Sequence, residues 1–231
     1  MNLGRTRWPD LAEGDVVLAV PLGATEQHGP HLPLDTDTTI ATELCHRLAS
    51  SVPGIAVAPP VPYGASGEHA DFPGTLSIGQ EALELLVTEL VRSADAFRGV
   101  IIVNGHGGNI EPVRRAVDRL TTENRKVLRW QPSAPADDSH AGHTETSVML
   151  RLRASAVSID HAEPGTTETL ATLIDRLRTS GIKAVSPNGV LGDPTGASPE
   201  AGEKILRLWA EDLVAAAAQW LAPTSVAKEL E

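Results

Sequence analysis

Between an apolar run and a helical pattern, the chain carries the stretch Thr25-Glu26-Gln27-His28-Gly29-Pro30-His31-Leu32-Pro33-Leu34-Asp35-Thr36-Asp37. It holds two histidines, one glutamate and two aspartates, and one glycine and two prolines restrict its path. The run before it, 16–20, is short, continuously apolar and rich in β-branched residues, as is typical of a fully buried strand. Apolar residues recur at helical spacing over 40–48. The stretch is therefore predicted to be a polar loop between a strand and a helix, with its side chains around a metal.

Strand and helix patterns alternate along the rest of the chain. Short apolar runs predict further buried strands at 55–58, 100–103 and 126–130, the last being weaker because it carries charges. The ranges with helical spacing are 83–94, 113–120, 148–152, 169–179 and 198–220. This alternation predicts an α/β sheet covered by helices on both faces. No internal repeat or shift in composition marks a boundary, so residues 1–231 are predicted to form a single domain.

Three helix starts carry recognisable signals. Ser77 and Gln80 have the spacing of a capping box, and Asn109 is placed to cap the helix that follows it. Ser198-Pro199-Glu200 combines a capping residue, a proline at the first helical position and an acid in the first turn. Each signal is expected to satisfy free backbone N–H groups at the start of a helix.

The chain is acidic, with 30 Asp and Glu against 19 Lys and Arg and a formal net charge of −11. This balance argues against nucleic acid or an anionic membrane as a partner, since both require a basic face. Cys45 is the only cysteine, so a disulfide within the chain is impossible and a reducing, cytoplasmic location is expected. The first eight residues are too polar for a signal peptide, and no apolar run approaches the ~20 residues needed to span a membrane.

Polar clusters follow the predicted strands at the point where each strand ends. Glu26-Gln27-His28 follows the first and residues 66–71 follow the second. His106 follows the third, and His140 comes after the fourth. In open α/β sheets, sites form at the carboxyl ends of the strands. We therefore expect these four clusters to face one crevice.

The side chains in these clusters suit a metal. Glu26 and His28 are two residues apart and share a face if the backbone is extended. Asp37 stands at a helix start, and His106 arrives from another strand. Histidine with carboxylate suits zinc, manganese or iron(II). A shared carboxylate could bridge two metals ~3.5–4 Å apart, with a nucleophilic water between them.

Later residues supply further candidates. Glu145 could complete a second metal site, while His140, or His143 as a second candidate, could transfer protons during amide cleavage. The residues predicted to act in catalysis are His140 and Glu145. The residues predicted to line the substrate side are Tyr63, Ser66, Glu68, His69 and His143.

Each candidate also has a structural interpretation. A lone histidine is more often a surface or packing residue, and His31 is expected to be one of these. Asp35 is placed to orient a ligand rather than bind metal. The alternative for residues 140–145 is a capped helix start with an exposed histidine. The run 104–109 is similar to a phosphate-cradling loop, but it lacks a P-loop lysine.

Three segments resemble the signatures of the creatininase family of metal-dependent amidohydrolases. The first is Glu26 to Asp37, the second is Asn104-Gly105-His106-Gly107-Gly108-Asn109, and the third is His140-Ala141-Gly142-His143-Thr144-Glu145-Thr146-Ser147. They occur in the order that the family has and span most of the chain. The resemblance implies a three-layer α/β/α fold with a mostly parallel central sheet, a homo-oligomer, and hydrolysis of C–N bonds by a metal-activated water.

The resemblance also implies two divalent metal ions per subunit, zinc or iron(II), with manganese as a further option. Glu26 and His106 would hold one ion and His28 the other, with Asp37 bridging them. Creatininase itself has a glutamate as its last ligand, two residues after the histidine of the second signature. That position is Gly108 here, which puts creatinine in doubt as the substrate and leaves Glu145 to fill the vacancy. His140 matches the catalytic histidine of the family.

Within the family, the likeness is greatest to a peptidase subgroup that acts in redox-cofactor biosynthesis. The segments that carry it are 63–69, 140–147 and Gly189-Val190-Leu191-Gly192-Asp193-Pro194. The subgroup releases a C-terminal dipeptide derived from Val-Tyr from a modified precursor peptide, which is the partner implied here. One alternative is a small-molecule amidohydrolase of the creatinine amidohydrolase or formamide deformylase type. Another is a non-catalytic metal-binding accessory protein.

Overall fold

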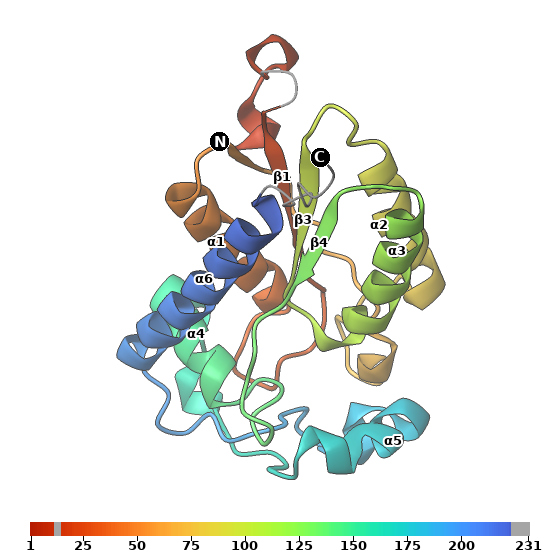
Figure 1. Ribbon diagram of the computed structural model, residues 1–231. Helices are drawn as coiled ribbons and strands as arrows, with labels where there is room; N and C mark the ends of the chain where they lie inside the picture. Colours follow the sequence, from red (N-terminus) through yellow and green to blue (C-terminus); the bar gives the residue numbers. More distant parts are fainter. Residues whose placement is uncertain (12–14, 223–231) are drawn as a thin grey trace, which may run out of the picture.

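The computed structural model describes residues 1–11 and 15–222, and its sheet consists of four strands in the order β2-β1-β3-β4 (Figure 1). The strands are β1 Val17–Leu22, β2 Ile55–Val57, β3 Gly99–Asn104 and β4 Val127–Trp130. All neighbouring strands are parallel, and β1 pairs with β3 along its whole length. Each of the four predicted apolar runs is therefore confirmed as a strand. Because the strands are parallel, their carboxyl ends lie along one edge of the sheet.

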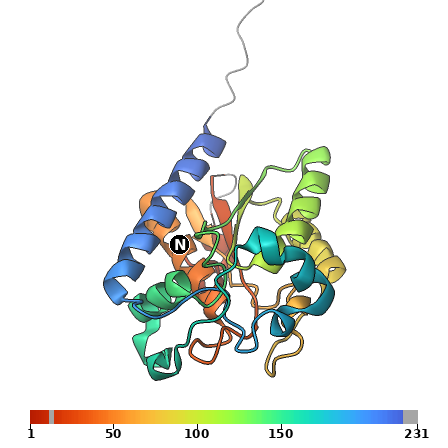
Figure 2. The ribbon, with the colours of Figure 1, turned by 90° about the horizontal axis from the view of Figure 1, so that it is seen from below.

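Helices cover both faces of this sheet, so the predicted three-layer α/β/α fold is confirmed (Figure 2). The helices are α1 Thr36–Ser51, α2 Gln80–Arg92, α3 Ile110–Thr122, α4 His143–Arg153, α5 Leu170–Ser180 and α6 Pro199–Leu221. Short 3-10 helices lie at Leu3–Arg5, Trp8–Asp10, Gly67–His69, Gly107–Asn109, Ala154–Ala156, Ile159–His161 and Ile182–Ala184. α1, α4 and α6 form one layer, and α2 and α3 form the other.

Alternate residues of the two central strands fill two separate cores. Val17 and Ala19 of β1 pack in the core under α1, α4 and α6, whereas Leu18 and Val20 pack in the core under α2 and α3. A strand that is buried on both faces needs apolar residues at every position, which explains why the sequence shows continuous runs rather than alternation.

Two of the predicted helix caps are wrong, and both side chains fix loops instead. α2 begins after Gly79, and the Ser77 hydroxyl accepts hydrogen bonds from the N–H groups of Ser66 and Gly79 at 2.9 and 3.2 Å. Asn109 accepts from the Ala65 N–H at 2.9 Å and donates to the Gly23 carbonyl at 3.0 Å. The predicted cap at Ser198 is confirmed, since its hydroxyl accepts from the N–H of residue 201 at 3.1 Å.

A third, smaller apolar cluster lies beyond the carboxyl ends of the strands. It joins α5 to the 3-10 helix Ile182–Ala184 through Leu173, Leu177 and Ile182, and Phe72 packs against it. In Figure 1, α5 lies at the bottom, on the side where the strands end. This cluster supports the loop of residues 67–72 from outside.

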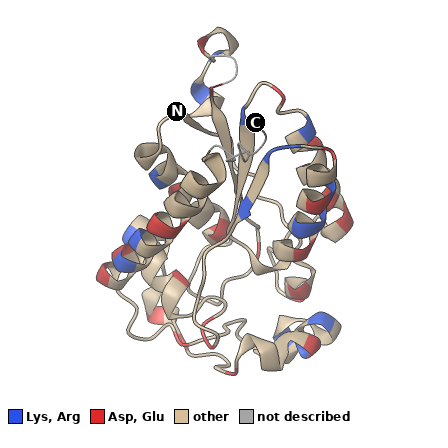
Figure 3. Cartoon of the chain, in the orientation of Figure 1, with Lys and Arg blue, Asp and Glu red and all other residues tan. Residues whose placement is uncertain are grey.

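Residues of both charge signs are mixed along the helices (Figure 3). Arg47 of α1 pairs with Glu203 of α6, and Arg115 of α3 pairs with Glu84 of α2. Within residues 1–11 and 15–222, no helix is both long and apolar enough to cross a membrane.

Candidate metal centre

The predicted site residues come together at the carboxyl edge of the sheet. The loop after β1 supplies Glu26 and His28, and the first turn of α1 supplies Asp37. The loop after β3 supplies His106, and the first turn of α4 supplies Glu145. All of them are buried except Glu145, which is partly accessible.

One group of potential ligands consists of Glu26, Asp37 and His106. The Nδ1 atom of His106 lies 3.1 Å from Oε1 of Glu26 and 3.3 Å from Oδ2 of Asp37. The other ring nitrogen of His106, Nε2, lies 3.1 Å from the Ala65 carbonyl oxygen, which can only accept a hydrogen bond. The proton of the neutral ring therefore belongs on Nε2, and the Nδ1 lone pair faces the two carboxylates.

A second group consists of His28, Asp37 and Glu145. Nε2 of His28 lies 2.9 Å from Oδ1 of Asp37 and 3.9 Å from Oε2 of Glu145. Nδ1 of His28 lies 3.1 Å from the Glu26 carbonyl oxygen, so a neutral ring presents its Nε2 lone pair to the carboxylates. Anchoring of the outer ring nitrogen by a backbone carbonyl is a common arrangement around metal-ligating histidines. Asp37 thus offers one oxygen to each group, which is the placement expected of a bridging ligand.

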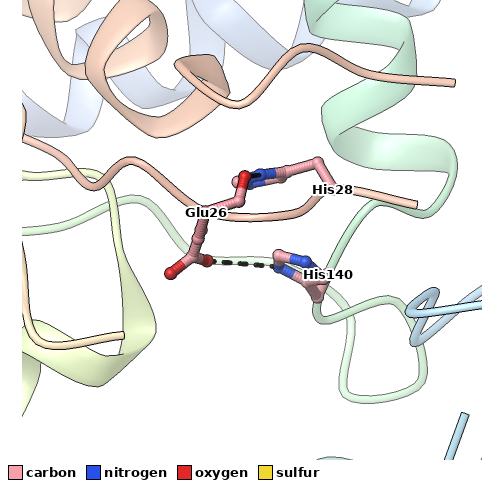
Figure 4. A group of neighbouring side chains, drawn as sticks. All are labelled: Glu26, His28 and His140. Atoms are coloured by element: carbon pink, nitrogen blue, oxygen red, sulfur yellow. Dashed lines mark hydrogen bonds and ion pairs between the residues drawn. The ribbon is translucent and has the colours of Figure 1, made fainter. Parts of the chain in front are cut away.

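His140 adjoins both groups from the loop that precedes α4 (Figure 4). Its Nδ1 lies 3.8 Å from Oε1 of Glu26, and its ring centroid lies 4.3 Å from that of His28. It is only 7% exposed, so the alternative of an exposed histidine beside a capped helix is wrong.

The buried carboxylates lack the partners that they need. Both oxygens of Glu26 and Oδ2 of Asp37 are buried without a hydrogen-bond partner among the described residues. An ionised carboxylate in such a place is strongly destabilising unless a cation accompanies it. The donor set of carboxylate oxygens and imidazole nitrogens therefore fits divalent metal ions.

The electrostatics of the cluster also favour a cation. Burial alone would lower the pKa of His28, but the charges of Asp37 and of the glutamates outweigh it and raise this pKa to about 10. The pKa of His106 is raised well above its usual range in the same way, with Glu26 and Asp37 overcoming burial. A field that draws protons onto these rings draws a metal ion as well.

The pKa values of His140 and Glu145 are displaced in the directions expected from burial. Burial and the neighbouring His28 lower the pKa of His140 well below its usual range. Burial raises the pKa of Glu145, although His28 opposes the shift. Oε2 of Glu145 accepts a hydrogen bond from the Ala141 N–H at 2.6 Å, which fixes the carboxylate beside His28.

The structure gives a steric reason for the glycine at position 108. A Cβ atom there would overlap the Ala65 carbonyl oxygen and lie 2.5 Å from both Oε1 of Glu68 and Nε2 of His106. A glutamate at this position would need the loop of residues 65–68 to move. Position 108 therefore supplies no carboxylate, and Oε1 of Glu68 lies beside it; Oε2 of Glu145 lies 3.9 Å from Nε2 of His28, and its role as a replacement ligand stays a prediction.

Three residues predicted to line the substrate side adjoin the cluster. The Ser66 hydroxyl and Oε1 of Glu68 lie 3.4 and 3.7 Å from Nε2 of His106. Nε2 of His69 lies 3.3 Å from Oε1 of Glu26. Tyr63 is exposed, and within the described chain no hydrogen bond or ion pair joins Tyr63 or His143 to the cluster.

Two neighbouring side chains take structural roles. His31 is buried, and its Nε2 lies 2.8 Å from the Thr146 hydroxyl, in line with the predicted packing role. Asp35 does not orient a ligand, because its carboxylate pairs with Arg153 at 2.8 Å on the outside of the cluster.

Sequence reasoning missed the role of Gln27. Its side chain is 5% exposed and contacts His69, His140 and the Gly189 carbonyl. The sequence pattern predicted that Glu26 and His28 share a face and assigned no role to Gln27. Its contacts come from residues 42, 113 and 162 positions away, which no local pattern reveals.

Known proteins resemble this chain over most of its length. The family model Creatininase, described as creatinine amidohydrolase, matches residues 4–217. The mycofactocin precursor peptide peptidase of Mycobacterium ulcerans is 47% identical over 92% of this chain and 86% of its own. The protein of that name from Mycolicibacterium smegmatis is 50% identical over 82% of this chain and 79% of its own. A solved structure described as manganese creatininase covers 96% of this chain and 99% of its own, with 26% identity and a TM-score of 0.78.

Replacing the shared carboxylate is expected to abolish metal binding. Asp37→Asn removes the negative charge between His28 and His106, so we expect purified protein to hold less than about a tenth of the parent's metal, given the charge dependence of such sites. Elemental analysis gives the metal content, and circular dichroism shows whether the chain is folded. Asp35→Asn, two residues away and outside the cluster, is the matched control and should bind as the parent does. A folded Asp37→Asn protein with the parent's metal content would contradict the bridging role.

Removing the carboxylate of Glu145 is expected to affect one ion only. Glu145→Gln leaves Glu26, Asp37 and His106 intact, so the metal content should fall from two equivalents per chain to one. Isothermal titration of zinc into the metal-free protein measures the stoichiometry. If this variant still bound two equivalents with the parent's affinity, Glu145 would not replace the carboxylate that is absent at Gly108.

Proposed function

The chain belongs to the creatininase family, and on that basis we propose that it is a metal-dependent peptidase of mycofactocin biosynthesis. Its substrate would be the modified precursor peptide, from which it releases the C-terminal dipeptide derived from Val-Tyr. One observation carries the proposal: the buried metal-ligand cluster lies in a chain that is 47% and 50% identical to proteins named mycofactocin precursor peptide peptidase.

We assign two divalent ions to the cluster. Glu26, Asp37 and His106 would hold one ion, and His28, Asp37 and Glu145 would hold the other. Zinc, iron(II) and manganese all suit these ligands. When bound, such ions lower the pKa of a coordinated water and polarise the scissile carbonyl group.

His140 is the group placed to carry a proton. Its Nε2 lies 2.8 Å from the Gln27 carbonyl oxygen, which can only accept, so the proton of the neutral ring sits on Nε2. The Nδ1 lone pair is left open toward Glu26 and the interior of the cluster. This nitrogen can take a proton during attack on the peptide carbonyl and give it to the departing amine.

The loop of residues 66–69 supplies the wall that meets the substrate. Ser66 and Glu68 lie beside His106, and His69 lies beside Glu26; these are two of the three ligands of the first group. α5 and the 3-10 helix after it pack against this loop from outside, through Phe72 and Ile182. The loop of residues 66–69 therefore packs against an apolar cluster. This packing helps to exclude water from the reacting groups.

We also propose that the chain forms a homo-oligomer. The family resemblance supports this proposal; Trp8 is 85% exposed and Leu208 of α6 is 60% exposed, and aromatic residues such as Trp are enriched at protein interfaces. The cytoplasmic location expected from the single cysteine stays a prediction.

The direct test is cleavage of the modified precursor peptide. Metal-loaded protein is expected to release the Val-Tyr-derived product, detected by mass spectrometry, and to do so less readily from the unmodified peptide. Creatinine and a formamide serve as comparison substrates for the small-molecule alternative. Turnover of either one with no product from the modified peptide would defeat the proposal.

The proton role of His140 makes a separate prediction. His140→Ala should lower kcat by about 10²–10⁴-fold, the usual contribution of a positioned acid or base, and keep two metal equivalents per chain. Steady-state kinetics and elemental analysis on the same preparation measure both quantities. A comparable loss in His143→Ala with normal turnover in His140→Ala would assign the role to His143 instead.

A further inference from the structure

The side chain of Gln27 has a defined orientation. The Gly29 N–H donates to its Oε1 at 2.9 Å, so this atom is the amide oxygen and the amide nitrogen is at the other corner. That nitrogen, Nε2, lies 3.0 Å from Nδ1 of His69, 3.0 Å from the Gly189 carbonyl oxygen and 3.1 Å from Nε2 of His140. Three potential acceptors therefore surround a group with two hydrogens.

The two amide hydrogens of Gln27 can be assigned by finding which of the three neighbouring atoms are able to accept them. Nε2 of His140 lies 2.8 Å from the backbone carbonyl oxygen of Gln27, so it carries a hydrogen and cannot accept one. The two amide hydrogens of Gln27 must then point to Nδ1 of His69 and to the Gly189 carbonyl. Every polar atom of the Gln27 side chain is satisfied in this arrangement, and no two hydrogens face each other.

This assignment distinguishes His69 from the other histidines of the cluster. In His28, His106 and His140, a backbone carbonyl takes the outer N–H, so the ring turns a lone pair inward. In His69 the outer nitrogen accepts from an amide, so the ring turns its N–H inward. That inward nitrogen lies 3.3 Å from Oε1 of Glu26.

We propose that Gln27 is a positioning residue that fixes the tautomer of His69, so that its inward nitrogen carries an N–H beside Glu26 and cannot ligate a metal. This nitrogen lies 3.3 Å from Oε1 of Glu26 without a hydrogen bond between them, and its N–H places a positive partial charge next to the buried carboxylate. The proposal rests on the proposed function only for its effect on turnover.

The surroundings of Gln27 are built to hold its amide in place. Gly189 has a φ of +80°, and a Cβ atom on it would overlap the amide oxygen of Gln27. A residue other than glycine would therefore push the amide away from His69, as well as being strained in the left-handed region. The Gln27 backbone N–H donates to the Thr75 hydroxyl at 3.2 Å, a contact that does not involve the side-chain amide.

The tautomers can be read by nitrogen NMR on zinc-loaded protein with ¹⁵N-labelled histidine, in the absence of peptide. In the parent, we expect the unprotonated nitrogen of His69 to be Nδ1. Gln27→Glu places an acceptor beside Nδ1 and should move the proton of His69 onto it. Gln27→Met, which has a similar length and no donor, should populate the same Nδ1-protonated form in part.

Two controls accompany these variants. His140 is bonded to the backbone of Gln27, so its proton should stay on Nε2 in both side-chain variants. Thr75→Val removes the contact with the Gln27 backbone N–H and should leave His69 as in the parent. Because the N–H beside Glu26 is replaced by a lone pair that repels the carboxylate, zinc affinity and kcat should fall by about 10–100-fold in the two Gln27 variants, with a smaller change in KM.

The proposal is overturned if His69 of the parent is protonated on Nδ1. It is equally overturned if His69 keeps the parent tautomer in both Gln27 variants, whatever happens to zinc affinity, because Gln27 would then act through packing alone. A parent protein that shows the expected tautomers but releases no dipeptide would defeat the proposed function and leave this assignment standing.

Discussion

The burial of Glu26 and Asp37 without sufficient hydrogen-bond donors is the constraint on which the site depends. These carboxylates are 0 and 1% exposed, and three of their four oxygens have no hydrogen-bond partner in the described structure. A domain tolerates such an arrangement only if something positive occupies the space between the oxygens. The outer ring nitrogens of His28 and His106 lie beside backbone carbonyl oxygens, so a neutral ring presents a lone pair to the carboxylates. The negative charge of the cluster raises the pKa of both rings and so favours positive charge here, as protons on these rings or as bound metal ions.

The fold could be predicted from the sequence because the strands are buried on both faces. Runs such as 16–20 and 100–103 have no polar residue to place, and a chain that alternates such runs with amphipathic helices has few options besides a parallel sheet with helices on both sides. The convergence of Glu26, Asp37 and His106 follows from the same fact, since parallel strands end at one edge. Two of the three predicted helix caps were wrong because local spacing does not show which other groups compete for a side chain: Ser77 and Asn109 form hydrogen bonds with loop residues that are distant in sequence.

Other features of the site depend on contacts that only the folded chain creates. The glycine at 108 signalled a missing ligand, but its cause is the Ala65 carbonyl, which comes from a different loop. Gln27 stands between two candidate ligands, yet its role depends on His69, His140 and Gly189 together. A sequence pattern identifies residues that bind metal because metals demand particular atoms. It does not identify residues that orient those ligands, because any donor in the right place will serve.

The carboxylates differ in how much the surrounding protein stabilises their negative charge. Asp37 lies in the first turn of α1 and Glu145 in the first turn of α4, where free N–H groups and the helix dipole favour negative charge. Such a helix end contributes about 0.3–1 kcal/mol, and up to about 2 kcal/mol in a partly buried position. Burial of an ion costs several kcal/mol, so the helices lessen the penalty without removing it. Glu26 has no helix end, and both of its oxygens lack hydrogen-bond partners in the described structure, whereas Asp37 lacks a partner at one oxygen only. Glu26 is therefore the carboxylate whose position depends most on a bound cation.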